Sequence, residues 1–314
     1  MTTIAFLGPE GTFAHAALRA LPVAAGATLL PTANVTLAID AVRAGAADAA
    51  LVPLENSVEG AVPATLDELA NGAPLVIAEE TYLAVDFVLM ARVGATLDKI
   101  ETVATHPHAE AQVRRWLIAN LPDAQVALVG STAGAAQAVA EGEYDAAVGA
   151  AVAAELYGLD ILAHSIADNG GAVTRFVLLT RPAPPPPPSG NDRTTLVAFL
   201  REDHSGALLE ILSEFGTRGV NLTRIESRPT KGRMGQYCFS IDCEGHVADE
   251  RVGDALAALH RVCGDVRYLG SYPRRDGAQG PIPRGRRDPE FTDARAWLAG
   301  IRESGQAQGS SPHE

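Results

Sequence analysis

Four short polar stretches carry residue types that could bind and act on a small anionic molecule. They are residues 8–13 (GPEGTF), 55–60 (ENSVEG), 105–108 (THPH) and 174–176 (TRF). Hydroxyl, amide and guanidinium groups can hold carboxylates, while a carboxyl or imidazole group can carry a proton. Each stretch alone also suits an ordinary turn, so its chemistry depends on whether the fold brings the four together.

The first stretch follows an apolar run and opens a helical pattern. Gly11 permits a tight turn and Thr12 is placed to cap the helix, so free N–H groups and the positive end of the helix dipole would form an anion site. The stretch is neither G-x-G-x-x-G nor a phosphate loop with its lysine, so it gives no sign of a nucleotide.

The second stretch ends a predicted buried strand. Asn56 and Ser57 can donate hydrogen bonds to carboxylates, and Glu55 could carry a proton. Thr65 begins a predicted helix on the same side. The alternative is a turn in which Asn and Ser bond their own backbone.

The third and fourth stretches add two histidines and an arginine. His106 and His108 lack a nearby third ligand, which argues against a metal, so we expect His106 to line a cleft or to pack the turn. Arg175 could hold a carboxylate with two hydrogen bonds, or could instead pair with a local acid such as Asp168.

Strand-like and helix-like segments alternate up to residue 181, which predicts an α/β fold with mostly parallel sheets. The predicted strands are 4–7, 49–54, 125–129, 146–149 and 176–180, and the predicted helices are 13–20, 37–44, 109–121 and 133–141.

An internal repeat indicates two similar lobes. Residues 41–50 (AVRAGAADAA) and 138–147 (AVAEGEYDAA) share a glycine and an aspartate at the same spacing before a buried strand. Two lobes would enclose a cleft, and ligands of open α/β sheets bind at the carboxyl ends of the strands.

Composition excludes several classes of protein. The net charge of −13 over 314 residues, without a Lys/Arg-rich run in the portion expected to fold, disfavours nucleic acid and anionic membranes as partners. Three cysteines (Cys238, Cys243 and Cys263) form neither a disulfide framework nor a zinc motif. The N-terminus lacks a signal-peptide pattern and no segment is long enough to span a membrane, so we expect a cytoplasmic protein.

A proline run at 184–188 marks a semi-rigid linker. Beyond it the predicted order is strand, helix, strand, strand, helix, strand, which is the ferredoxin-like order. These elements are 194–200, 207–216, 221–227, 236–243, 249–263 and 266–269, and the tail has one further possible helix at 291–303.

Taken in order, the four polar stretches closely resemble those of prephenate dehydratases over residues 3–181. The resemblance implies a two-lobed fold like that of periplasmic binding proteins, and the conversion of prephenate to phenylpyruvate, carbon dioxide and water without metal or organic cofactor. It makes Thr174 the essential threonine. Many members have asparagine where this chain has Ala172, and Asn169 could supply the missing hydrogen bond.

We expect Thr174 to bind the departing hydroxyl, with Glu55 or His106 as alternative proton sources. The carboxylates would be held by Arg175, Asn56, Ser57 and the turn at Gly11 and Thr12. Thr65 and Phe176 are also expected to contact the substrate. The motifs do not distinguish prephenate from arogenate.

The stretches HSGAL and ESRP resemble the ACT domain that accompanies this family, over residues 194–271. The resemblance implies phenylalanine binding between paired ACT domains, and therefore a dimer or tetramer. The residues expected near the effector are Gly206, Ala207, Leu208, Asn221, Leu222, Glu226, Ser227, Arg228 and Pro229.

The predicted domains are a catalytic domain (1–181, with lobes 1–78 plus 168–181 and 79–167), a linker (182–192), an ACT domain (193–272) and a partly disordered tail (273–314). Two rivals are a two-lobed binding protein without chemistry and a stand-alone amino-acid sensor. The first lacks a secretion signal or a DNA-binding helix pair, and the second leaves the first 181 residues unexplained.

Overall fold

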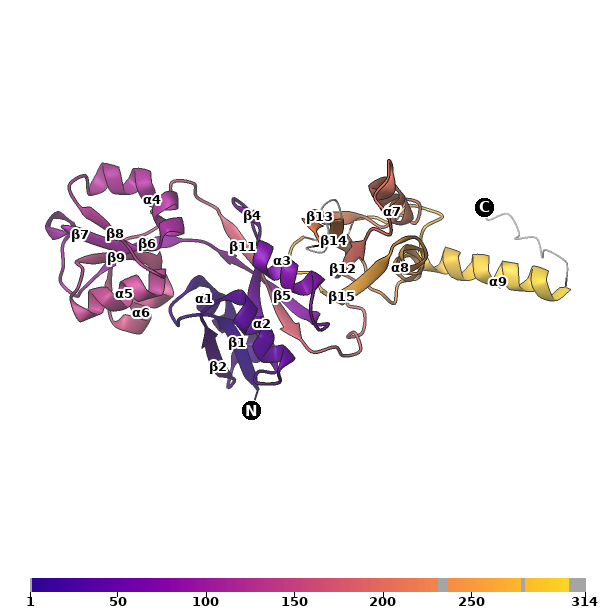
Figure 1. Cartoon of the computed structure of the whole chain (residues 1–314), viewed down its shortest axis with the longest axis horizontal. Helices are drawn as coiled ribbons and strands as arrows, with labels where there is room; N and C mark the ends of the chain where they lie inside the picture. Colours follow the sequence, from indigo (N-terminus) through magenta and orange to yellow (C-terminus); the bar gives the residue numbers. More distant parts are fainter. Residues whose placement is uncertain (1, 231–236, 278–279, 305–314) are drawn as a thin grey trace. The chain divides into compact units, whose positions relative to one another are not determined.

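The structure is a computed structural model that describes residues 2–230, 237–277 and 280–304 (Figure 1). These residues form two compact units. The first comprises the described residues of Met1–Leu75 and Glu79–Pro182, and the second those of Val76–Ala78 and Ala183–Glu314.

The first lobe of the first unit is a mixed sheet with the strand order β2-β1-β3-β11-β5, and a short β4 pairs with β3. Its strands are β1 (Thr3–Leu7), β2 (Thr28–Thr32), β3 (Ala49–Asn56), β4 (Gly60–Ala61), β5 (Val76–Ala84) and β11 (Val173–Thr180). Its helices are α1 (Phe13–Arg19), the 3-10 turn η1 (Pro22–Ala24), α2 (Val35–Arg43) and α3 (Pro63–Ala70).

The second lobe repeats this plan with the strand order β10-β6-β9-β7-β8. Its strands are β6 (Phe87–Ala91), β7 (Thr102–Thr105), β8 (Gln125–Leu128), β9 (Ala146–Ala150) and β10 (Asp160–Ala163). Its helices are the 3-10 turn η2 (Leu97–Lys99), α4 (Pro107–Asn120), α5 (Thr132–Glu141) and α6 (Ala151–Tyr157).

The repeated aspartate plays the same structural part in both lobes. Asp48 Oδ2 accepts a hydrogen bond from Thr3 N at the start of β1, and Asp145 Oδ2 accepts one from Thr102 N at the start of β7, both at 2.9 Å. Asp48 directly precedes β3, which pairs in parallel with β1. Asp145 directly precedes β9, which pairs in parallel with β7. The predicted repeat is therefore a pair of equivalent folding units.

The expectation of mostly parallel sheets needs correction. β11 runs antiparallel to β3, and β6 runs antiparallel to both β9 and β10. The reason is that the chain crosses between the lobes twice. β6 follows the first crossing and runs against β9, and β11 follows the second crossing and runs against β3. The two crossings bond to each other, with Val85 N donating to Ala172 O and Ile166 N donating to Phe87 O.

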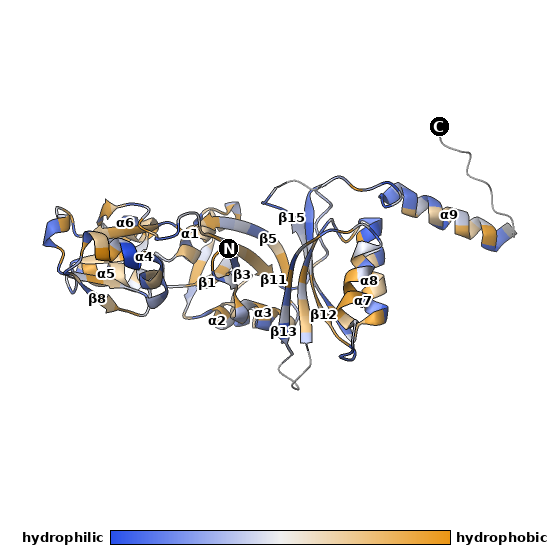
Figure 2. Ribbon diagram, turned by 90° about the horizontal axis from the view of Figure 1, so that it is seen from above, coloured by the Kyte–Doolittle hydropathy of each residue, from blue (hydrophilic) through white to orange (hydrophobic). Residues whose placement is uncertain are grey.

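Apolar side chains on the strands and on one face of the helices bury a separate core in each lobe. Ile4, Phe6, Leu18 and Leu51 are fully buried in the first lobe. In Figure 2 the central strands of this lobe are coloured largely as hydrophobic, as expected for strands that are covered on both faces.

Residues 183–190 of the second unit are exposed. The turn at the end of this segment is closed by Asp192, whose carboxylate accepts from Ser189 N and Gly190 N. The strand–helix order that follows is the predicted one. It consists of β12 (Asp192–Phe199), α7 (Ala207–Gly216), β13 (Leu222–Pro229), β14 (Tyr237–Glu244), α8 (Glu250–Val262) and β15 (Asp265–Pro273).

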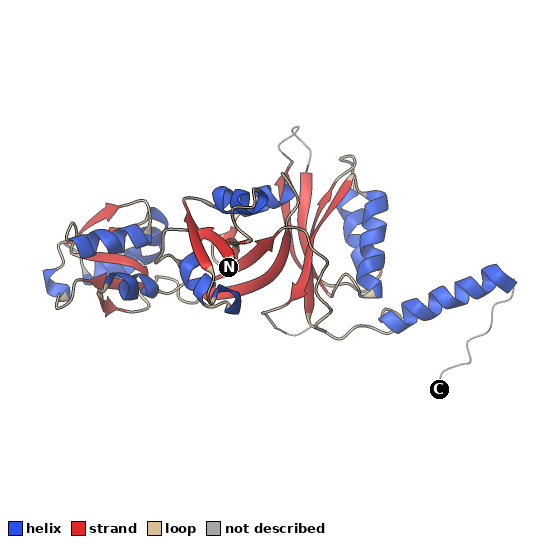
Figure 3. Ribbon diagram, turned by 90° about the horizontal axis from the view of Figure 1, so that it is seen from below, coloured by secondary structure: helices blue, strands red, loops and turns tan. Residues whose placement is uncertain are grey.

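These strands form one antiparallel sheet in the order β13-β14-β12-β15, and α7 and α8 cover one of its faces (Figure 3). The predicted tail helix is present as α9 (Asp288–Ser304). Gln236 and residues 305–314, for which a strand end and disorder were predicted, lie outside the described residues. No helix in the described ranges is long and apolar enough to cross a membrane.

Candidate active site

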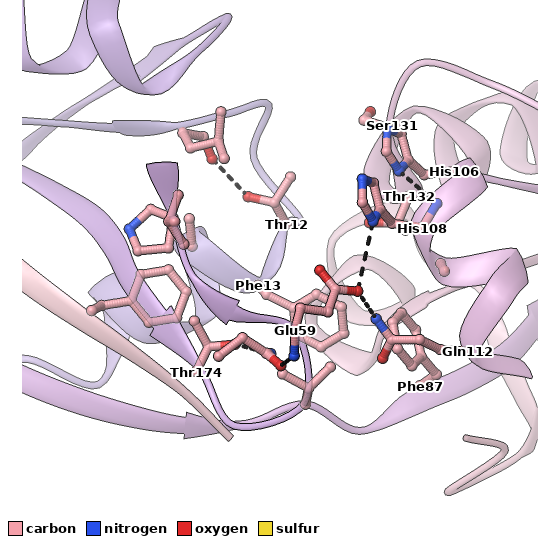
Figure 4. A pocket seen from close by; sticks show the side chains of 18 of the residues that line it. Thr12, Phe13, Glu59, Phe87, His106, His108, Gln112, Ser131, Thr132 and Thr174 are labelled. Atoms are coloured by element: carbon pink, nitrogen blue, oxygen red, sulfur yellow. Dashed lines mark hydrogen bonds and ion pairs between the residues drawn. The ribbon is translucent and has the colours of Figure 1, made fainter. Parts of the chain in front are cut away.

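A cavity of about 450 Å³ lies between the two lobes of the first unit, at the carboxyl ends of their parallel strands (Figure 4). Its polar lining includes Thr12, Asn56, Glu59, His106, His108, Gln112, Ser131, Thr132 and Thr174. These residues end or follow β1, β3, β7 and β8 or begin β11, so equivalent loops of both lobes contribute to the same cavity.

Thr174 and Asn56 are joined by a hydrogen bond in the cavity, and its direction can be assigned. Asn56 Nδ2 donates to Thr174 Oγ1 at 2.9 Å, while Asn56 Oδ1 accepts from Val58 N at 2.8 Å and from Glu59 N at 3.0 Å. The two backbone donors fix which end of the amide is oxygen, so Thr174 Oγ1 must be an acceptor in this bond. The hydroxyl hydrogen of Thr174 is thereby available to another acceptor.

The turn after β1 is fixed internally. Thr12 Oγ1 accepts from His15 N and donates toward Leu7 O, and Gly11 N donates to His15 Nδ1 at 3.0 Å. Burial lowers the pKa of His15, which keeps this imidazole neutral. Thr12 lines the cavity, whereas the amide of Gly11 is engaged by His15, so Gly11 shapes the turn and does not offer its N–H to a ligand.

Three phenylalanines form an apolar wall. Phe13 and Phe87 meet edge to face with ring centroids 5.1 Å apart, and Phe176 lies beside Thr174 on the cavity lining. A carbocyclic ring could pack against this surface while polar groups contact its substituents.

The amino-terminal ends of two helices point their first turns at the cavity. His106 caps α4 through His108 N, and Ser131 caps α5 through Gly134 N. Burial, followed by the proximity of His108, lowers the pKa of His106. None of the described residues that line the cavity is Lys or Arg, so the helix dipoles and N–H groups are its main source of positive potential.

Arg175 does not occupy the position predicted for it. Its side chain is 4% exposed and its Nε donates to Oε2 of the fully buried Glu80 at 2.8 Å. The side chains of neighbouring strand residues point to opposite faces, so the arrangement that puts Thr174 at the cavity turns Arg175 into the lobe. The expectation that Arg175 grips a carboxylate in the cavity is corrected accordingly.

Three further predicted residues support the walls without being among the described residues that line the cavity. Ser57 is tied to β11 because its Oγ accepts from Val173 N and its own N donates to Val173 O. Thr65 is buried and its hydroxyl donates to Pro53 O. Glu55 stands opposite Arg175 in the β3–β11 ladder.

Ala172, where many family members have asparagine, is buried in the returning crossing, and its carbonyl accepts from Val85 N.

Several lining residues had not been assigned a role from the sequence. Glu59, His108 and Gln112 meet across the cavity mouth, and Ser131 and Thr132 begin α5. The internal repeat was a usable signal for the last two, because it makes the loop before α5 equivalent to a loop of the first lobe. Among the described residues, no group of three or more His, Cys, Asp or Glu is placed to hold a metal.

The second unit contains a smaller cavity of about 280 Å³ at the amino-terminal end of α7. Gly206, Ala207, Leu208 and Ser227 line it together with His204 and Phe239. Asn221 lines a different cavity, against residues 280–286. Leu222, Glu226, Arg228 and Pro229 lie on β13 but are not among the described residues that line either cavity.

Comparison with known proteins decides the family. The family model for prephenate dehydratase matches residues 4–184 and the model for the ACT domain matches residues 194–261. The chain belongs to the prephenate dehydratase family. A prephenate dehydratase from Amycolatopsis methanolica is 52% identical over 308 residues, which cover 98% of this chain and 100% of the relative.

Solved structures agree with this membership. The prephenate dehydratase of Arthrobacter aurescens in complex with L-Phe superposes with a TM-score of 0.90 and is 49% identical, covering 96% of this chain and 100% of that one. A structure described as a novel type of quorum-quenching acylase is 36% identical with a TM-score of 0.77, covering 86% and 97%. The predicted family, the two-lobed α/β fold and the ACT domain of this prephenate dehydratase family member are confirmed.

Proposed function

We propose that this chain converts prephenate to phenylpyruvate in the cavity between its two lobes, with Thr174 as the donor to the departing hydroxyl. The observation that carries the proposal is the fixed direction of the Asn56–Thr174 hydrogen bond. Because Asn56 can only donate to Thr174, the threonine hydrogen can be directed at a leaving oxygen.

In the proposed reaction the bond between the ring and its carboxylate breaks and carbon dioxide leaves. The released electron pair completes the aromatic ring and expels hydroxide from the opposite ring carbon, and a proton converts that hydroxide to water. Aromatisation supplies the driving force, so the protein needs mainly to orient the substrate and to stabilise the leaving oxygen.

The first turns of α4 and α5 are the proposed sites for the two carboxylates of the substrate. Both helices belong to the second lobe and begin on the cavity, and anions are stabilised at helix amino termini. The ring would lie against Phe13, Phe87 and Phe176. This arrangement needs no arginine in the cavity, which agrees with the burial of Arg175 against Glu80.

His106 is the better placed of the two proposed proton sources. It lines the cavity, whereas Glu55 lies in the β3–β11 ladder. His106 Nδ1 accepts from His108 N, so a neutral imidazole carries its hydrogen on Nε2. Because its pKa is lowered, His106 is neutral at neutral pH. We therefore propose that it acts as a hydrogen-bond donor or proton relay and not as a protonated general acid.

The test is formation of phenylpyruvate from prephenate by purified Thr174→Val. Loss of one well-placed donor should reduce kcat by about 10²–10³-fold. Thr180→Val is the matched control, because Thr180 lies at the other end of β11, opposite Ala49. Near-normal turnover by Thr174→Val would refute the assignment. Arogenate, offered separately, tests the alternative substrate.

The second unit is proposed to bind L-phenylalanine at the cavity formed by Gly206, Ala207, Leu208 and Ser227. Support comes from the ACT domain and from the L-Phe complex of the Arthrobacter aurescens relative. Gly206 has φ +96°, so a bulky side chain there would be strained and would enter the cavity. We further propose a dimer or tetramer assembled through this unit, in which effector binding changes catalysis by linkage.

Calorimetry with L-phenylalanine tests this site. Gly206→Trp should abolish binding, while Gly216→Ala, at the other end of α7 with nothing within 4 Å of an added Cβ, should retain it. Light scattering with and without L-phenylalanine reports the assembly state. Unchanged affinity in Gly206→Trp would remove the effector from this cavity.

A further inference from the structure

Glu59 is the one carboxylate among the described residues that line the cavity. A site proposed for a doubly charged anion gains nothing electrostatically from a carboxylate in its wall, because like charges disfavour binding. Its presence therefore calls for a role other than direct attraction of the substrate.

The side chain of Glu59 bridges the two lobes. It extends from the turn between β3 and β4, and its Oε1 accepts from Gln112 Nε2 at 2.8 Å and lies 3.6 Å from His108 Nδ1 (Figure 4). Gln112 and His108 belong to α4 of the second lobe. Glu59 is half-exposed, so this contact lies at the mouth of the cavity and not in its interior.

The backbone of Glu59 is tied to the catalytic pair in the first lobe. Its N–H donates to the same Oδ1 of Asn56 that fixes the Asn56 amide against Thr174. A continuous series of hydrogen bonds thus runs from Thr174 through Asn56 and Glu59 to Gln112.

Gln112 is held from its other side by the returning crossing. Asp168 N donates to Gln112 O at 2.7 Å, and the Asp168 carboxylate accepts from the backbone N–H groups of Arg115 and Trp116 in the same stretch of α4. The main chain of Gln112 is therefore anchored by Asp168 and its side-chain amide by Glu59.

We propose that Glu59 is a positioning residue of the dehydratase site, which orients the Gln112 amide on the cavity wall and couples α4 to the Asn56–Thr174 pair. The inference rests on the proposed function. What Glu59 supplies is a hydrogen-bond acceptor at a defined place, so glutamine should replace it better than alanine does.

The test compares Glu59→Ala and Glu59→Gln in the full-length protein by prephenate turnover. Glu59→Ala should lower kcat/KM by about 10–100-fold, the scale expected for loss of one orienting hydrogen bond. Glu59→Gln, which keeps an acceptor for Gln112 Nε2, should recover at least about tenfold of that loss. Equal losses in the two variants would overturn the proposal.

Glu155→Gln is the matched control. Glu155 of α6 also pairs across the lobes, with Arg19 of α1, but it lies outside the cavity lining. If Glu155→Gln impairs turnover as much as Glu59→Ala does, bridging the lobes is what matters and the positioning role is wrong. Unchanged turnover in Glu155→Gln supports the specific path through Asn56 and Gln112.

A double-mutant cycle isolates the contact itself. Once Gln112→Leu has removed the oriented amide, adding Glu59→Ala should cause less than about threefold further loss in kcat/KM, because contacting residues are non-additive. Fully additive losses would refute the coupling. Absence of turnover by the wild-type protein would refute the proposed function instead, which keeps the two failures distinguishable.

Discussion

Arg175 Nε on β11 lies 2.8 Å from Glu80 Oε2 on β5, and both side chains are almost completely buried. Arg175, which the sequence suggested for substrate binding, is thus part of a buried ion pair inside the lobe, next to Thr174 in the strand. Thr174 and Arg175 are neighbours in β11, but their side chains have different surroundings. Thr174 lines the cavity, whereas Arg175 links β11 to β5 through Glu80.

Arg175→Met should therefore act first on stability. Removing one partner of a buried ion pair leaves an uncompensated charge and costs about 3–5 kcal/mol. Urea unfolding measures this loss, and the double variant Arg175→Met with Glu80→Met should recover much of it. If Arg175→Met is as stable as the wild-type protein and only raises KM, the structural role of the ion pair is wrong and Arg175 binds a substrate carboxylate instead.

His15 should make stability depend on pH on the acid side. Its folded-state pKa is lowered, chiefly by burial, so the stability it contributes is fully present above the unfolded pKa of about 6.5 and is lost as pH falls through the lower folded value. Protonation would also break the bond from Gly11 N to Nδ1.

Urea unfolding at pH 7.5 and at pH 5.5 measures the effect. The wild-type protein should lose more stability over this range than His15→Gln, by at most about 1.4 kcal/mol per pH unit. Equal slopes for the two proteins would show that His15 does not titrate in this way.

Gly11→Ala should impair both stability and substrate binding. Gly11 has φ +89°, and an added Cβ would lie 3.2 Å from Ala133 Cβ and 3.4 Å from Ala153 Cβ, both in the second lobe. Gly45→Ala is the control, because Gly45 has φ +77° with nothing within 4 Å. Both should lose about 1 kcal/mol or more to strain, but only Gly11→Ala should raise KM for prephenate.

Cys243 and Cys263 of the second unit should be inert in the native protein. Burial raises the pKa of Cys243 to about 12 and that of Cys263 to about 11, which leaves little reactive thiolate at pH 8. Alkylation followed by peptide mapping should label both only after denaturation. Rapid native labelling of Cys243 would contradict its burial in the core.

The strand–helix order and the internal repeat could be predicted because both depend on local patterns. The helix start at Thr12 followed from its capping side chain, and α7 and α9 appear close to their predicted ranges. The repeat also predicted a cleft at strand ends, which is where the structure places Asn56 and Thr174.

The orientation of individual side chains could not be predicted in the same way. A shift of one residue along a strand moves a side chain to the opposite face, and the β3–β11 pairing shifts register between Arg175 and Phe176. The Glu59–Gln112 contact joins residues on different lobes, so it could not be predicted from a local sequence pattern.

The two hydrogen-bonded crossings near Val85 and Ala172 are the part of the first unit where both lobes share backbone. Each lobe has its own core and its own aspartate clamp, yet each provides only half of the groups that would surround a ligand. We therefore expect substrate affinity to depend on the distance between the two lobes, which the crossings set. Substitutions at Ala172 or Ile166, which belong to the crossings but are not among the described residues that line the cavity, should accordingly change selectivity.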